Sequence, residues 1–236
     1  PIRVELGDGV VLGRHTVCES VHPHTINHEW DPVVPGRRSK IQDHCNETFF
    51  RMVEMNREPG VKVVYYDLVV RAYDDGVAIR YRIPKQRDYK VHVMDESIGF
   101  VFPDDSQAWV VDYKGFESHQ EEPFAKQSLR SISDAAYVGL PLVVEGEHAM
   151  LAITEAALVD YAGMYLRQAT GDRKDGAMLR TCLAKRPDQI NAVVAESNLV
   201  SPWRAIMIGR EPSDFLSNDL VLNLNEPCAI EDTSWI

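Results

Sequence analysis

One carboxylate stands out in the sequence, because Glu155 lies within a largely apolar stretch of strand-forming residues that runs from Ile153 to Ala162. Such a stretch, flanked by turns, predicts a strand inside a sheet. A buried carboxylate is costly unless it is paired or bound to a cation. The residues alone therefore leave two interpretations open: a Glu that points to water, and a carboxylate that binds a cation.

Other groups that could do chemistry give weaker signals. His22 and His24 would share one face of a strand and could hold a metal, with His28 close by. Pro23 argues against a strand there, and no carboxylate or thiol completes a ligand set, so we predict a solvated loop. The chain has no glycine-rich phosphate loop, no Gly-x-Ser-x-Gly elbow and no Ser or Cys with a recognisable base partner.

Charge and cysteine content exclude further classes. The formal net charge of −11 argues against a nucleic-acid partner and against docking on anionic lipid. No apolar run approaches transmembrane length, so we expect no membrane insertion. The cysteines Cys18, Cys45, Cys182 and Cys228 are scattered and form no CxxC pair, which argues against a zinc knuckle or a thioredoxin-type site. Single thiols are expected, and a disulfide stays open.

Short strands separated by turns must position these groups. The clearest signal is a hairpin, in which Asp74-Asp75-Gly76 joins two alternating runs and Gly76 accepts the positive φ of the turn. The acidic loop 114–124 separates two later strands. The expected strands are Ile2–Leu12 as a hairpin, Asn46–Asn56, Val61–Tyr73, Val77–Ile83, two short strands in Tyr89–Phe102, Gln107–Tyr113, Ser128–Ser133, Leu142–Val144, His148–Thr154, Tyr165–Ala169, Met178–Ala184, Asn191–Ala195 and Trp203–Ile208.

Many short strands with almost no 3.6-residue period predict an all-β sandwich or barrel. A polar turn is expected over residues 170–176, and the one plausible helix, Pro212–Leu216, is short. We expect one domain over residues 1–236, since no linker or repeat divides the chain.

Three blocks of sequence resemble a known family. They are Glu155 to Ala162, Ser201 to Ile208, and Leu222 to Cys228 followed by Glu231 to Ile236. Weaker similarity to the same family occurs at Asp31-Pro32-Val33, Ile41 to Glu47 and Tyr73 to Tyr81. In this order the blocks resemble the N-terminal domain of glycoside hydrolase family 97, bacterial exo-acting α-glucosidases and α-galactosidases. The resemblance implies a large two-sheet β-super-sandwich of the galactose-mutarotase type, with at most one or two short helices.

The resemblance also implies that this chain and a separate catalytic domain contribute different residues to the active site. The family's catalytic carboxylates lie on a (β/α)8 barrel expected after residue 236 and absent from this chain, so we expect no catalytic residue here. A calcium ion near the sugar takes one ligand from the N-terminal domain, at the position that matches Glu155. Asp160 is a weaker candidate, because an extended strand would place it on the opposite face. We expect the Glu155 carboxylate to be unpaired in the isolated chain.

Substrate contacts and location follow from the same resemblance. An acid followed by an aromatic, as in Glu122 and Phe124, occupies the corresponding loop, and Trp109 could stack on a sugar ring. The resemblance implies an oligosaccharide substrate, the protein's own barrel as partner, and a periplasmic or secreted enzyme. The alternative is a stand-alone carbohydrate-binding or protein-interaction β-sandwich module.

The acid pairs Asp74-Asp75 and Glu121-Glu122 do not by themselves form the two catalytic carboxylates of a glycosidase, because adjacent strand residues point to opposite faces.

Overall fold

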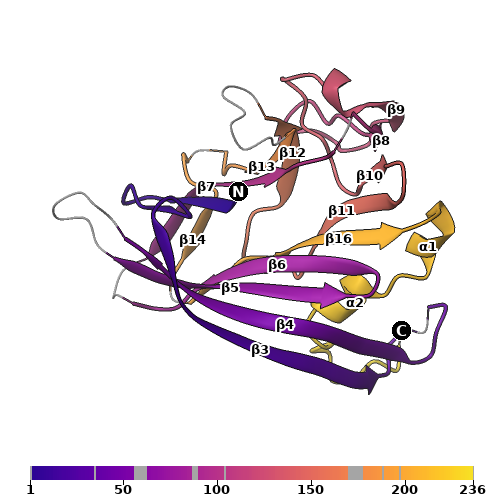
Figure 1. Ribbon diagram of the computed structural model, residues 1–236, viewed down its shortest axis with the longest axis horizontal. Coiled ribbons are helices and arrows are strands. Elements are labelled where there is room, and N and C mark those ends of the chain that lie inside the picture. Colours follow the sequence, from indigo (N-terminus) through magenta and orange to yellow (C-terminus); the bar gives the residue numbers. More distant parts are fainter. Residues whose placement is uncertain are drawn as a thin grey trace.

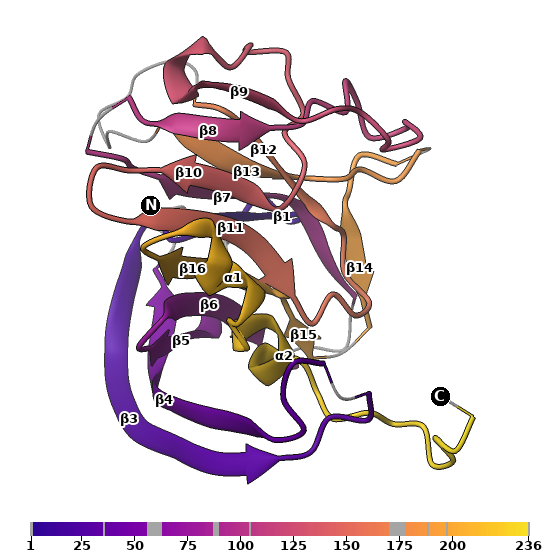
Figure 2. The same ribbon diagram turned by 90° about the vertical axis from the view of Figure 1, so that its right-hand side faces the viewer.

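Two antiparallel sheets face each other and make up most of the protein (Figures 1 and 2). The computed structural model describes residues 2–34, 36–55, 63–86, 90–103, 105–169, 178–187, 189–196 and 198–235. The turn predicted over residues 170–176 lies outside these ranges, as does the start of the predicted strand Val61–Tyr73. The predicted all-β, two-sheet sandwich is confirmed.

The large sheet has ten strands among the described residues. Nine follow the order β3-β4-β5-β6-β16-β11-β10-β8-β9, and β15 pairs with β6. Their bounds are β3 Thr16–Trp30, β4 Ile41–Glu54, β5 Val64–Tyr73, β6 Gly76–Ile83, β16 Trp203–Gly209, β11 Met150–Ala156, β10 Leu142–Glu145, β8 Gln107–Val110, β9 Ala125–Ser128 and β15 Leu199–Val200.

The small sheet has six strands in the described part of the chain. Its order is β12-β13-β7-β1-β2, with β14 also paired to β7. The bounds are β12 Met164–Gln168, β13 Leu179–Leu183, β7 Val91–Phe100, β1 Ile2–Leu6, β2 Val11–Leu12 and β14 Val193–Ala195. Val138 bridges Asp112 and Leu166, which links the small sheet to the chain that follows β8.

Apolar side chains fill the space between the sheets, and a second, smaller cluster lies on the outer face of the large sheet. The inner core takes buried residues from both sheets, for example Val93, Leu142, Ile153 and Leu179. The outer cluster contains Trp203 and takes Leu220 and Leu224 from the short helix α2 Leu220–Leu224 (Figure 2). The other short helix, α1 Pro212–Leu216, buries none of its residues. None of the described helices is long and apolar enough to cross a bilayer.

Gly76 lets helix α2 approach β6 closely. A Cβ at this position would lie 2.7 Å from Cδ2 of Leu220 and 2.8 Å from the carbonyl oxygen of Ile206. Only a glycine leaves room for both neighbours. The positive φ predicted for Gly76 is wrong, because Asp74 and Asp75 form the turn and Gly76 is already the first residue of β6.

The histidine-rich segment is a strand, and the predicted loop there is wrong. His22, His24 and His28 all lie in β3, which pairs with β4 along its length. Pro23 is tolerated because β3 is the first strand in the order of the sheet, and an edge strand can lack a donor on its free side.

Three other strand predictions need correction. The segment Tyr89–Phe102 holds one strand, β7, because pairing with β1, β13 and β14 supports it along its length. Strand β9 ends at Ser128, and a 3-10 helix follows over Leu129–Ser131. The Asp105 carboxylate accepts the backbone N–H of Arg130 and the hydroxyl of Ser128, which replaces ladder bonds. Strand β11 stops at Ala156, well before Ala162.

Candidate functional site

Strand β11 places Glu155 on the inner face of the large sheet, one residue before the strand ends. Ile153, two residues earlier on the same face, is 1% exposed and belongs to the inner core. The Glu155 side chain itself is 15% exposed. The carboxylate therefore lies at the margin of the core, as the apolar sequence around it predicts, and still reaches solvent.

Arg204 pairs with Glu155, so the expectation of an unpaired carboxylate is wrong. The two residues are in register on adjacent strands β16 and β11. Nη1 of Arg204 donates to Oε2 of Glu155 at 2.5 Å. The backbone N–H of Met164 also donates to this carboxylate, at 3.3 Å to Oε2 and 3.4 Å to Oε1. These bonds fix the orientation of Glu155 and leave Oε1 with one long hydrogen bond.

A second carboxylate, from the other sheet, completes the cluster. Glu96 on β7 accepts two hydrogen bonds from Arg204, Nε to Oε1 at 2.7 Å and Nη2 to Oε2 at 3.0 Å. The hydroxyls of Tyr81 and Tyr161 donate to the same Oε2, at 3.0 Å and 3.4 Å. Arg204 and Glu96 are 2% and 0% exposed, so this is a fully buried, bidentate ion pair between the sheets.

The cluster holds two carboxylates against one guanidinium. Burial raises the pKa of Glu155, the charge of Glu96 adds to this effect, and Arg204 opposes it. Burial alone would lower the pKa of Arg204, but Glu96 and Glu155 outweigh it and hold that pKa above its usual value. Burial raises the pKa of Tyr161, which keeps its hydroxyl protonated as a donor. When Glu155 is ionised, the cluster carries one excess negative charge, which a cation at the exposed edge of Glu155 would neutralise.

The donor set fits one calcium ligand and no more. Calcium takes six to eight oxygen ligands in most protein sites. Within the described ranges, no three His, Cys, Asp or Glu side chains are grouped so that they could hold a metal ion. Glu155 can offer Oε1 and a lone pair of Oε2, so the other ligands would have to come from outside the residues described.

Asp160 does not lie on a strand, and the predicted opposite strand face is wrong. The backbone leaves the sheet after Ala156 and enters the left-handed region at Ala157, with φ of 54°, and at Asp160, with φ of 51°. These bends end the hydrogen bonding between β11 and its neighbouring strands, and Asp160 lies exposed in the turn that follows.

The two predicted sugar contacts lie elsewhere. Trp109 on β8 is 42% exposed, and its Nε1 donates to Oε1 of Glu145 at 2.8 Å. Glu122 lies in the loop between β8 and β9, with its Oε1 at 3.7 Å from Nε2 of His119. No hydrogen bond or ion pair joins either residue to Glu155 in the part of the chain that the structure describes. The same loop reaches Tyr165, because Gln120 donates to its hydroxyl at 2.7 Å.

The histidines and cysteines form no metal centre in the described structure. Nε2 of His24 lies 3.1 Å from Oε1 of Glu47, and His22 bonds to Ser20. All four cysteines are free thiols, which settles the disulfide question left open by the sequence.

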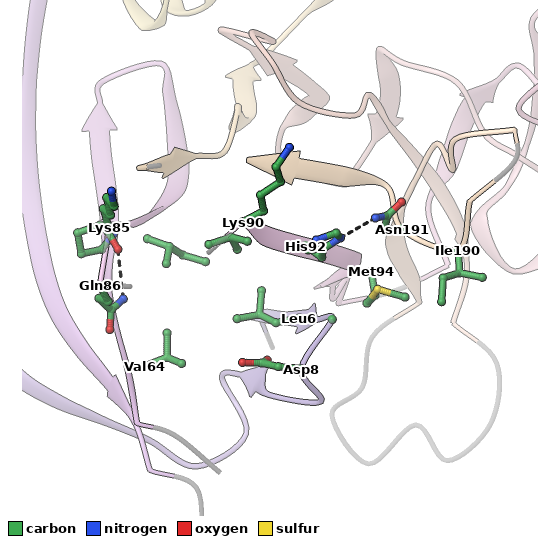
Figure 3. Close-up of a pocket in the computed structure, with 14 residues that line it drawn as sticks. Leu6, Asp8, Val64, Lys85, Gln86, Lys90, His92, Met94, Ile190 and Asn191 are labelled. Carbon is green, nitrogen blue, oxygen red and sulfur yellow. Dashed lines mark hydrogen bonds between the residues drawn. The ribbon is translucent and has the colours of Figure 1, made fainter. Parts of the chain in front are cut away.

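A separate cavity of about 600 Å³ opens between β1 and β7 of one sheet and β5 and β6 of the other (Figure 3). Its walls are mainly apolar, with Leu6, Val64, Ile83 and Met94 among them. Asn191 and His92 are joined by a hydrogen bond of 2.8 Å on one side. None of the site residues predicted from the sequence is among the described residues that line it.

Glu155 was predicted from the sequence, whereas the residues that bond to it were not. Arg204 lies in one of the quoted blocks, and a lone arginine within the apolar run Trp203–Ile208 is a signal of the same kind as Glu155. Glu96 and Tyr161 gave no such signal, because their partners are distant in the chain.

Comparison with known proteins identifies the family of this chain. The family model for the glycosyl-hydrolase 97 N-terminal domain matches residues 1–227. The chain is 25% identical to a retaining alpha-galactosidase of Bacteroides thetaiotaomicron, covering 100% of this chain and 37% of that protein. It is 28% identical to a probable retaining alpha-galactosidase of Streptomyces bingchenggensis, over 72% of this chain and 24% of that protein.

A solved relative shows the same likeness in three dimensions. It is a family 97 glycoside hydrolase of Pseudoalteromonas sp. strain K8 in complex with acarbose, at 26% identity and a TM-score of 0.83. The match covers 100% of this chain and 34% of that enzyme. The chain thus spans between about a quarter and somewhat more than a third of the relatives it resembles. It belongs to the family of glycoside hydrolase 97 N-terminal domains.

Proposed function

We propose that this chain is the N-terminal domain of a calcium-dependent α-glycosidase, which packs on a larger catalytic part of the same protein and donates Glu155 to the calcium. Family membership over residues 1–227 supports the first half of the proposal. The named relatives support an α-galactosidase or a close variant of it.

The position of Glu155 supports the second part of the proposal, that this residue is a calcium ligand. Its carboxylate is clamped by Arg204 and the Met164 amide, and its side chain keeps 15% exposure at the end of a strand. A ligand held in one orientation loses little freedom when an ion binds, so Arg204 and Glu96 pre-organise the site. When bound, calcium polarises a substrate hydroxyl and stabilises negative charge that develops in the reaction.

The substrate we propose is an oligosaccharide with a terminal α-linked galactose or glucose. Trp109 and Glu122 are our candidates for sugar contacts away from the ion. The Trp109 ring is partly exposed, and Lys126 lies 5.7 Å from its centre and occupies part of the space over it. We further propose a periplasmic or secreted location.

Calcium titration of the full-length enzyme tests the proposal. We expect Glu155→Gln to weaken calcium binding and to lower kcat/KM for an aryl α-galactoside, with partial recovery in excess calcium. The matched control is Glu147→Gln, whose side chain is 77% exposed and bonds to no part of the cluster. Equal calcium affinity in wild type and Glu155→Gln would show that Glu155 is not a ligand. Sugar binding by a full-length protein that hydrolyses no α-glycoside would favour the stand-alone binding module.

A further inference from the structure

The turn after β11 exposes two apolar side chains to solvent. Ala157 and Asp160 both have positive φ, which non-glycine residues other than Asn and Asp seldom adopt, and the N–H of Val159 bonds to the carbonyl of Ala157 at 3.0 Å. Leu158 is 48% exposed and Val159 is 67% exposed. Backbone strain that presents apolar groups to solvent is typical of a contact surface.

The end of helix α2 joins this turn to the outer face of the large sheet. Oδ1 of Asn225 accepts the N–H of Ala157 at 2.9 Å. Two residues earlier, the carbonyl of Asn223 accepts Nη1 of Arg71 at 3.2 Å. The turn and Arg71 on β5 are therefore both bonded to the C-terminal end of one short helix.

Arg80 on β6 is a partly buried cation that forms no ion pair with any of the described residues. Its guanidinium lies 4.2 Å from the ring centre of Trp203, and that of Arg71 lies 4.9 Å from the same ring. Arg71 pairs with Glu47 at 2.6 Å, whereas Nε of Arg80 is buried and has no acceptor among the described residues. Burial lowers the pKa of Arg80 and the charge of Arg71 lowers it further, whereas the charge of Glu226 opposes this shift without outweighing it. A carboxylate placed against Arg80 would compensate this charge.

We propose that the Ala157–Asp160 turn and Arg80 form one docking surface, which receives the catalytic part of the same enzyme. That part would offer an apolar recess to Leu158 and Val159 and a carboxylate to Arg80. This inference rests on the proposed function, in which a catalytic part meets Glu155. The turn begins two residues after Glu155, so docking here would bring further oxygen ligands next to that carboxylate. The relatives, of which this chain spans 34–37%, are long enough to supply such a part.

Hydrogen exchange of the full-length enzyme, compared with the 236-residue chain, tests the surface. We expect amides of residues 157–163 and 76–83 to exchange at least about tenfold more slowly in the full-length enzyme, because docking excludes water and suppresses local opening. The double variant Leu158→Ser/Val159→Ser and the single variant Arg80→Gln should each remove that protection.

Two matched variants serve as controls. Ile190→Ser removes an apolar side chain that is 81% exposed at the rim of the 600 Å³ cavity, and Arg130→Gln removes an exposed charge beyond β9. Both should leave the protection intact. In the 236-residue chain, the double variant should shift the melting temperature by no more than about 2 °C, because exposed side chains contribute little to folding. If Arg80→Gln shifts the melting temperature by more than this, Arg80→Lys replaces it as the test variant. Arg80→Lys keeps the positive charge and should therefore keep the protection from exchange.

The outcomes separate this inference from the proposed function. Equal exchange at both segments in the two proteins would overturn the docking surface, even in an enzyme that hydrolyses α-galactosides. Full protection in the double variant would overturn it as well. Protection that the variants remove, in a protein without glycosidase activity, would support the surface and overturn the proposed function.

Discussion

Arg204 and Glu155 are cross-strand neighbours whose side chains meet at 2.5 Å, and the same guanidinium binds Glu96 on the opposite sheet. One side chain therefore links β16, β11 and β7 through charged hydrogen bonds. The arrangement ties the orientation of the proposed calcium ligand to the packing of the two sheets.

Replacement of Arg204 should be among the most damaging single changes in the chain. Arg204→Gln leaves Glu96 and Glu155 without their cation, and the loss of one partner of a buried pair costs about 3–5 kcal/mol. Urea unfolding at pH 7 measures this change in the free energy of unfolding. Arg82→Gln, which removes an exposed arginine of β6, should cost no more than about 0.5 kcal/mol. A loss below about 1 kcal/mol for Arg204→Gln would mean that the ion pair contributes little to stability.

The four thiols should fall into two reactivity classes. Cys18 and Cys228 are exposed, whereas burial raises the pKa of Cys45 and raises that of Cys182 to about 12. Only the thiolate reacts, so at pH 8 Cys182 holds on the order of a thousandfold less reactive form than an ordinary thiol. Its reactivity should rise as the pH approaches 12. A disulfide reagent should modify two thiols quickly in the folded chain and all four in urea, and a third fast thiol without urea would contradict the burial.

Gly76→Ala should destabilise the outer cluster. The added Cβ would lie 2.7 Å from Leu220 and 2.8 Å from a backbone oxygen, so helix α2 or strand β16 has to shift. Overpacking of this kind costs about 1–3 kcal/mol in the free energy of unfolding. The control is Gly36→Ala, where no atom lies within 4 Å of the new Cβ, and there stability should stay the same or rise by up to about 1 kcal/mol. Thermal unfolding of both variants compares them directly, and equal melting temperatures would show that α2 yields at no cost.

The 236-residue chain alone should hydrolyse no aryl α-galactoside or α-glucoside. We expect the catalytic carboxylates on another part of the enzyme, and the chain offers calcium one carboxylate where a stable site needs several. Millimolar calcium should therefore leave its melting temperature unchanged, since a ligand stabilises only the state that binds it. Turnover that survives repurification, or a calcium-dependent rise in melting temperature, would contradict this prediction.

The sequence by itself determined the class of fold and most of the local elements. The hairpin of β5 and β6 follows from alternation on either side of Asp74-Asp75-Gly76, because the signal lies within a few residues of the turn it specifies. Helix α1 over Pro212–Leu216 was predictable for the same reason. Glu155 was identifiable because a carboxylate in an apolar strand is unusual.

Tertiary structure decided what surrounds that carboxylate. Glu96 and Arg204 are 108 residues apart, and only the stacking of two sheets brings them together. Long strand β3 depends on its pairing with β4, and the edge position that tolerates Pro23 is a property of the whole sheet. Strand β11 ends at Ala156 because the chain bends where Asn225 of a distant helix accepts the Ala157 amide. Local alternation cannot encode such contacts, since their energy appears only when segments far apart in the chain have packed.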